Sequence, residues 1–319
     1  MAPCAMQALH TLLQPGSLPA RWHGVPVVRP GLPSTEDGTA LGIAPHTDRT
    51  RADDVTTAPG TAPRIAVCLH PFYPELLPEI QSHLAGLPAG WRLLVTVPEF
   101  ACTPQLREGL AHHPDTRVFA LPNRGRGVWP WLQLLAAGVF DDCDWVCKLH
   151  SKKRPHTAPG QAWRQQIMHS LAGPEDNVRA LLQALAADPG VSLVGPAQYL
   201  KNVGDPHWGH RSDNTGMWLA RHLQLPPLPG GASEWPYFAG TMFRFRPAAL
   251  RPLARAGLQA ADFAPEMGQL DGTRAHAMER IVTRAVRAAG FATGQRDAGT
   301  RRMETVDWPS RTAPDGLTA

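Results

Sequence analysis

The stretch Arg64-Ile-Ala-Val-Cys-Leu-His70 marks where a folded core begins. It is a short apolar run that follows a loop and ends in a polar residue, which is typical of a buried strand. Two similar runs follow, Trp91-Arg-Leu-Leu-Val-Thr-Val97 and Arg117-Val-Phe-Ala-Leu121, and helix-like segments at 74–84 and 105–112 separate the three. This βαβαβ alternation predicts an α/β fold with a mostly parallel central sheet flanked by helices. Ligands of such sheets lie at the carboxyl ends of the strands.

The pattern continues to about residue 291 and then stops. The further elements that we expect are a helix over 128–140, a strand over 145–150, a helical region with a break over 161–187, a strand over 191–195, a loop over 202–216, a hairpin-like strand over 238–245 and helices over 247–256 and 272–289. Residues 1–63 are rich in Pro and Gly, a composition that predicts a largely disordered N-terminal extension. Residues 64–292 form the predicted folded domain, and residues 293–319 a mobile C-terminal tail.

Composition excludes several classes of protein. The chain has 319 residues, of which 43% are hydrophobic, so a full core is possible. A formal charge of +4 is too small to predict a nucleic-acid partner. The five cysteines show no paired-ligand spacing, which favours a reducing compartment over disulfides or zinc. No leader-like N-terminus and no long apolar run is present, so we expect a cytoplasmic protein.

Two basic segments are candidates for binding an anion. Asn123-Arg124-Gly125-Arg126-Gly127 lies between a strand and a helix, where backbone N–H groups and the helix dipole favour a negative charge. The alternative is a tight turn that needs glycine, with solvated arginines. Lys148-Leu-His150-Ser151-Lys152-Lys153-Arg154 places Lys148 and His150 on one face of a strand, just before a cationic loop. Here the alternative is a solvated charge run.

Three further segments carry candidate site residues. Asp271 and Thr273 stand at a helix start, where capping is the ordinary role, and His276 and Glu279 share a helical face. Glu279 is either half of an ion pair with Arg280 or a general base.

The other two segments are apolar. Gly240, Thr241 and Met242 suit core packing or a wall for a sugar. His70, Phe72 and Tyr73 follow the first strand, where an aromatic residue either stacks a base or joins the core.

Taken in order, these motifs resemble the rhamnan synthesis protein F family. The resemblance rests on His70-Pro-Phe72-Tyr73, Asn123-Arg-Gly-Arg126, Lys148-Leu-His150-Ser-Lys152-Lys153, Gly240-Thr-Met-Phe243, and Asp271-Gly-Thr273 with His276, Glu279 and Arg280. It implies a single Rossmann-type domain like the GT-A glycosyltransferases. One departure is Gly127, because the family pattern usually has Asp at this position. That difference bears on donor choice or activity.

The resemblance implies a bacterial glycosyltransferase that moves a sugar, rhamnose or another hexose, from a nucleotide-sugar donor to a growing surface polysaccharide or lipid-linked glycan. The implied donor site is His70, Phe72, Tyr73, Asn123, Arg124, Arg126, Lys148, His150, Lys152 and Lys153. Asp271, Glu279 and His276 are the implied catalytic residues, and Gly240, Thr241 and Met242 line the acceptor or sugar pocket.

Many transferases of this kind carry two metal-binding aspartates where this chain has Lys148 and His150. We therefore expect no required metal cofactor, with cations balancing the departing diphosphate, while manganese or magnesium stays open. Peripheral association with membrane-bound biosynthetic machinery at the inner face of the plasma membrane is compatible with this function. Two alternatives stay open. One is an inactive nucleotide-sugar-fold scaffold in a polysaccharide assembly, and the other is a basic-loop module for nucleic acid or anionic lipid.

Overall fold

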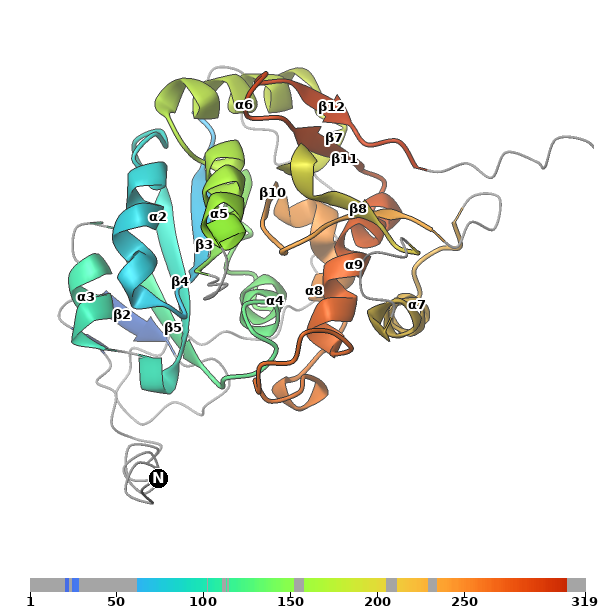
Figure 1. Cartoon of the computed structure of the whole chain (residues 1–319), viewed down its shortest axis with the longest axis horizontal. Coiled ribbons are helices and arrows are strands. Elements are labelled where there is room, and N and C mark those ends of the chain that lie inside the picture. The colour runs from blue at the N-terminus through green and yellow to red at the C-terminus, as the bar shows by residue number, and fades with distance from the viewer. Residues whose placement is uncertain are drawn as a thin grey trace, which may run out of the picture.

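One mixed sheet organises the domain (Figure 1). The computed structural model describes residues 21–22, 25–28, 62–101, 103–110, 113, 115–151, 158–204, 211–228 and 234–308. Within these ranges ten strands follow the order β1 (Arg21–Trp22), β2 (Val25–Val28), β5 (Thr116–Leu121), β4 (Arg92–Pro98), β3 (Ile65–His70), β6 (Trp145–His150), β10 (Phe243–Phe245), β7 (Val191–Pro196), β11 (Ala292–Arg296) and β12 (Met303–Thr305).

Most neighbouring strands are parallel. The run from β2 to β6 is parallel throughout, and β7 is parallel to β11. Strand β10 lies antiparallel between β6 and β7, and β1 and β12 form antiparallel edges. A small second sheet pairs β8 (Leu200–Asn202) with β9 (Pro236–Phe238). The predicted α/β class with a mostly parallel sheet is confirmed.

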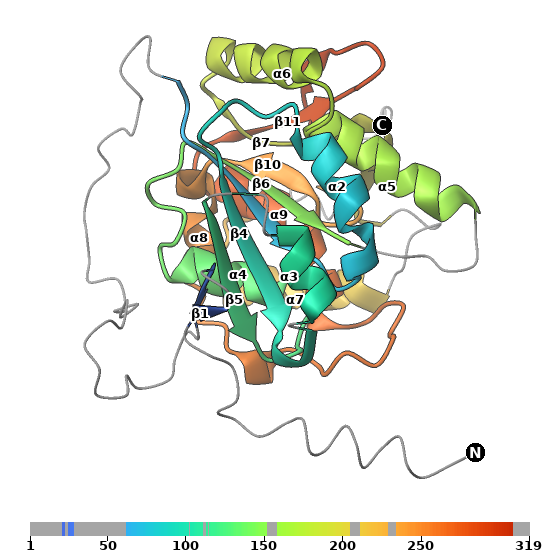
Figure 2. The ribbon, with the colours of Figure 1, turned by 90° about the vertical axis from the view of Figure 1, so that its left-hand side faces the viewer.

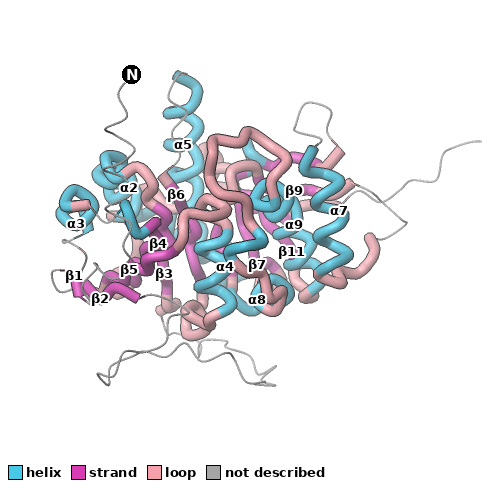
Figure 3. Tube along the Cα trace, turned by 90° about the horizontal axis from the view of Figure 1, so that it is seen from below, coloured by secondary structure: helices cyan, strands magenta, loops and turns pink. Residues whose placement is uncertain are grey.

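Helices cover both faces of the sheet (Figures 2 and 3). Helices α2 (Leu77–Leu84), α3 (Pro104–Leu110), α5 (Ala158–Leu171) and α6 (Glu175–Ala187) pack on one face. The other face carries α4 (Trp129–Ala136), α8 (Arg251–Ala254) and α9 (Arg274–Ala288), and α7 (Arg211–His222) packs on α9. Short 3-10 turns precede α2 and α8, at Pro74–Leu76 and Pro247–Leu250.

Local sequence explains where helix α9 begins and which of its faces is buried. Thr273 caps its first turn, because its hydroxyl accepts from the His276 backbone N–H. Met278, Ile281 and Ala285 recur at helical spacing, and all three are buried against the sheet. His276 and Glu279, on the same helix, are half-buried and lie at the margin of this packed face.

Two predictions inside the domain need correction. Residues 238–245 do not form one strand, because a turn at 239–242 separates β9 from β10. Gly240 and Thr241 have φ angles of 100° and 52°, which a strand does not allow. The predicted loop 202–216 also gives way to α7 from Arg211 onward.

The ends of the domain differ from the prediction as well. The prediction of a mobile tail from residue 293 is wrong for residues up to 305, because β11 pairs with β7 and β12 pairs with β11. Within 1–63, β2 adds a strand beside β5. Strand β1, at Arg21–Trp22, pairs with β2, and the other residues of that predicted disordered extension before residue 62 lie outside the described residues. None of the helices that the structure describes has the length and apolar character of a membrane span.

Candidate functional site

The 239–242 turn is contacted by polar side chains from two elements, β6 and α9, at the carboxyl edge of the sheet. Lys148, near the end of β6, is 1% exposed, and its Nζ donates to the Thr241 carbonyl oxygen at 2.8 Å. Two residues further on, His150 Nε2 lies 2.6 Å from the Gly240 carbonyl oxygen. Because a carbonyl only accepts, this His150 nitrogen carries a proton.

Glu279 on α9 holds the same turn from the other side. Its Oε2 accepts from the Gly240 backbone N–H and from the Thr241 hydroxyl, each at 2.7 Å. The ring of Trp163 lies against Gly240, where an added Cβ would come within 2.7 Å of it. Lys148, His150 and Glu279 together form what we call the turn clamp, which fixes two residues in left-handed backbone conformations.

Burial changes the acid–base behaviour of Lys148. Desolvation lowers the pKa of its ammonium to about 8, and the nearby Glu279 carboxylate opposes part of this decrease. The rings of Trp131 and Phe243 lie 5.4 and 5.9 Å from Nζ, a distance at which an aromatic face attracts a cation.

His70 ends β3 and is 6% exposed. Its Nδ1 lies 3.0 Å from the hydroxyl of Thr96 on β4. Burial, and secondarily the charge of Lys148, lower the pKa of His70 to about 4, so the ring is neutral at pH 7. Gly127 packs against this ring, since a Cβ there would lie 3.2 Å from the His70 Cβ. A larger residue at position 127 would therefore press on His70.

The 123–127 turn is tied to the start of α9. Arg126 has a φ of 57°, and its Nε donates to Glu266 Oε2 at 2.7 Å. A further guanidinium nitrogen lies 3.1 Å from His276 Nε2, and another donates to the Gln269 carbonyl. Since arginine only donates, His276 Nε2 accepts. His276 Nδ1 lies 3.4 Å from the Thr273 backbone nitrogen and 2.7 Å from the Thr273 hydroxyl.

Most of the remaining predicted site residues make contacts within the fold itself. Arg124 donates to the Phe263 carbonyl at 3.1 Å, and Asn123 is half-buried in the same turn. Asp271 Oδ1 lies 3.7 Å from the guanidinium of Arg280, which itself lies over the Tyr237 ring. Met242 is 1% exposed and belongs to the core. Lys152 and Lys153 lie outside the described residues.

Aromatic residues gather after β3 and β4. Phe72 makes edge contacts with Tyr73 and with Phe100, whose ring centroids are 5.1 and 6.5 Å away. The Tyr73 backbone N–H donates to the Ser151 hydroxyl at 2.7 Å, which joins this segment to the end of β6. Phe100 is half exposed and was not among the predicted site residues.

Sequence reasoning also missed Thr96, Glu266 and Trp163. Thr96 did leave a signal, because it is the one hydroxyl residue in an otherwise apolar strand, and it is 1% exposed. Glu266 and Trp163 stand in segments without a motif, and only their contacts with Arg126 and Gly240 show their part in the site.

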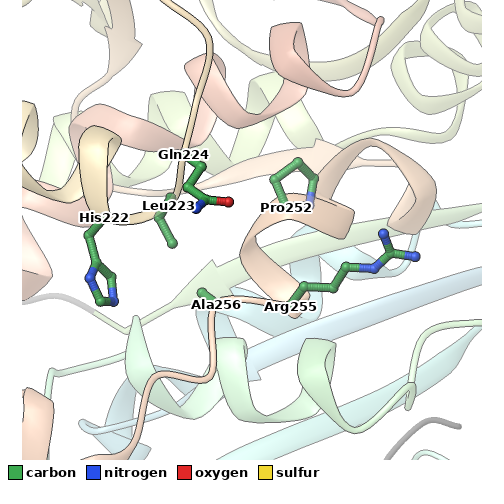
Figure 4. A pocket seen from close by; sticks show the side chains of 6 residues that line it. All are labelled: His222, Leu223, Gln224, Pro252, Arg255 and Ala256. Carbon is green, nitrogen blue, oxygen red and sulfur yellow. The ribbon is translucent and has the colours of Figure 1, made fainter. Parts of the chain in front are cut away.

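The site is not a preformed metal centre within the described ranges, since no three His, Cys, Asp or Glu side chains there are placed to hold an ion. A pocket of about 280 Å³ lies elsewhere, between the ends of α7 and α8 (Figure 4). Its lining consists of His222, Leu223, Gln224, Pro252, Arg255 and Ala256. None of the predicted site residues belongs to it.

The model of one protein family, rhamnan synthesis protein F, matches residues 47–291. The chain belongs to this family. The family match begins before the predicted boundary at residue 64 and ends close to the predicted end of the domain. The resemblance inferred from the motif order is thereby confirmed.

Two curated relatives are uncharacterized proteins named WxcX, from Xanthomonas campestris pv. campestris strains B100 and ATCC 33913. They are 34% and 33% identical to this chain over 246 residues. The match covers 76% of this chain but only 34% of each relative. The chain thus spans about a third of the length of these curated relatives.

Among solved structures, TarS residues 1–349 from S. aureus matches at 11% identity, with a TM-score of 0.36, over 70% of this chain and 55% of that one. Glucosyl-3-phosphoglycerate synthase from Mycobacterium tuberculosis, in complex with Mn²⁺ and UDP, matches at 18% identity, with a TM-score of 0.30, over 59% of this chain and 58% of that one. Likeness at this level carries no conclusion about substrate or reaction.

Proposed function

We propose that this chain is a glycosyltransferase that moves rhamnose or another hexose from a nucleotide-sugar donor to a growing surface polysaccharide or lipid-linked glycan. The observation that carries the proposal is the convergence of His70, Lys148, His150, Arg126 and Glu279 at the carboxyl edge of a mostly parallel sheet. Membership of the rhamnan synthesis family supports a polysaccharide product.

The donor diphosphate would lie between the 123–127 turn and the end of β6. Arg126 is 31% exposed, so its guanidinium can exchange its contacts with Glu266 and Gln269 for phosphate oxygens. Lys148 is buried behind the turn and would act through its charge. A positive charge held in place before the reaction stabilises negative charge that develops on a leaving diphosphate. The nucleobase of the donor would stack near Phe72 and Phe100.

Of the candidate bases, we assign the acceptor base to Glu279. Asp271 lies beside the buried cation Arg280, and the Nε2 lone pair of His276 is directed at Arg126. Glu279 is half-buried at the mouth of the turn and would take a proton from an acceptor hydroxyl. His276 would then orient Arg126. With Lys148 and His150 in place of acidic residues, we also propose transfer without a required metal ion.

A second candidate function is a scaffold that binds a nucleotide sugar without turnover. The observation that favours it is the turn clamp itself, since Lys148, His150 and Glu279 already hold backbone groups. This arrangement gives the motif a structural role that does not need catalysis.

One experiment separates the two candidates. Purified protein is titrated with dTDP-, UDP- and GDP-sugars, each with chelator and with manganese, and the same samples are assayed for released nucleotide with a glycan acceptor. A ligand that binds the native state raises the melting temperature. Selective binding with release supports the transferase, and binding without release under any metal condition supports the scaffold.

Matched variants link the result to the site. We expect Arg126→Met to weaken donor binding at least tenfold, because its partly exposed guanidinium would bind the phosphate oxygens directly. The control Arg179→Met removes an exposed arginine of α6 that pairs with Glu175 and Asp176, and it should leave binding unchanged. No binding of any nucleotide sugar would overturn both candidates.

A further inference from the structure

Two fully buried arginines face the junction of α5 and α6, away from the turn clamp. Arg244 on β10 and Arg296 on β11 are each 0% exposed. Arg244 Nε donates to the Leu171 carbonyl at 2.5 Å, at the end of α5. Within the described part of the chain, both terminal nitrogens of Arg244 and the Nε of Arg296 have no hydrogen-bond partner. Each such buried donor carries a free-energy cost.

The two guanidinium groups reach the same short segment. Arg296 donates to Asn177 Oδ1 at 3.0 Å, and Asn177 Nδ2 lies 3.4 Å from the Ala172 carbonyl, one residue beyond the partner of Arg244. The sheet register agrees, because Arg244 is paired with Val194, and Val194 with Gly294, two residues before Arg296. Residues two apart on a strand share a face.

No carboxylate acts on Arg244 among the described residues, whereas Arg296 donates to the Arg301 carbonyl, and the neighbouring Asp297 carboxylate offsets part of the lowering of the Arg296 pKa by burial. Glu175 and Asp176, at the start of α6, are exposed and pair with Arg179. The thiol of Cys147 is the near neighbour of Arg244, and burial raises its pKa, so it stays neutral. Arginine itself keeps its proton in proteins. A water molecule would satisfy the N–H groups but not the charge.

We propose that the terminal nitrogens of Arg244 bind one small inorganic anion of the halide class beneath the α5–α6 junction. The size follows from the surroundings, since apolar Val194 and Leu181 border this region and the arginines are wholly enclosed. A bound anion would join β10 to the α5–α6 junction. The site is independent of the proposed transferase activity.

The test compares thermal unfolding of the full chain in sodium chloride and in sodium gluconate at equal ionic strength. We expect chloride to raise the melting temperature by about 3 °C at tenfold the dissociation constant. The dependence should disappear in Arg244→Met, which keeps the length and apolar stem of the side chain. Arg164→Met is the control, because Arg164 is similarly buried but pairs with Glu79 at 2.7 Å, and it should keep the dependence.

A second measurement covers the case in which Arg244→Met does not fold. Crystals of the wild-type protein grown in bromide should show an anomalous peak within hydrogen-bond distance of the Arg244 guanidinium. Equal melting temperatures in the two salts, or bromide crystals without that peak, would overturn the proposal and leave water as the partner of the Arg244 N–H groups.

Discussion

The ammonium group of Lys148 donates to the carbonyl oxygen of Thr241 at 2.8 Å, and this bond joins residues 93 positions apart in the chain. It connects the end of β6 to the turn before β10. Strand β10 also pairs with β6. The motif lysine therefore shapes the site through a backbone contact. Any ligand contact of Lys148 would come in addition to this one.

Replacing Lys148 by Met should lower the free energy of unfolding by about 1–3 kcal/mol, because the Thr241 carbonyl and the Glu279 carboxylate lose a buried cationic partner. Methionine keeps most of the stem volume, so little cavity forms. Urea unfolding measures the effect. Arg179→Met, which removes an exposed ion pair, should change stability by less than about 1 kcal/mol. Equal stability of Lys148→Met and wild type would show that the contact is energetically neutral.

Stability should fall in acid partly because of His70. The unfolded histidine takes up a proton near pH 6.5, whereas the folded one does so only near its pKa of about 4. The unfolded state thus binds more protons in this window, and stability that is present above pH 6.5 is lost as the pH falls towards 4. Relative to His70→Gln, the wild type should lose up to about 3 kcal/mol more across the window. Parallel pH profiles of the two proteins would contradict the assignment.

The Glu279→Gln variant should affect stability and sugar transfer to different extents. Glu279→Gln keeps an oxygen that can accept from Gly240 and Thr241, so the free energy of unfolding should change by no more than about 1 kcal/mol. Transfer should decrease by about 10²-fold or more if the carboxylate is the acceptor base. Single-turnover transfer and urea unfolding are measured on the same preparation. A variant that transfers at the wild-type rate would remove Glu279 from the catalytic role.

Gly240 should tolerate no side chain. In Gly240→Ala the new Cβ would lie 2.7 Å from the Trp163 ring at a φ of 100°, so strain and overpacking add to about 2–5 kcal/mol. Gly257→Ala is the matched control, because its φ is 63° and no atom lies within 4 Å of an added Cβ. We expect it to cost about 1–2 kcal/mol. Similar melting temperatures for the two variants would show that Trp163 does not constrain the turn.

The sequence predicted which segments contribute to the candidate site, but not which side chains contact one another there. The motif segments at His70, Lys148, Gly240 and Glu279 do meet at one edge of the sheet. The motif residues do not all face open solvent, however, because the side chains of Lys148 and His150 are hydrogen-bonded to backbone carbonyls of the turn. Charge and strand position predict where a lysine lies, whereas its partner depends on a segment far away in the sequence.

Apolar periodicity and β-prone runs act over a few residues, so they were enough to predict the type of nearly every element within 64–291. The sequence also predicted that the polar motifs follow strands. Three features depend on contacts between distant segments: the insertion of antiparallel β10 between β6 and β7, the turn at 239–242, and the ordering of β11. Ala292-Thr-Gly-Gln-Arg296 has no apolar run, and it becomes a strand because β7 supplies hydrogen-bond partners along its length. Such pairing is non-local, so no short window of the sequence contains it.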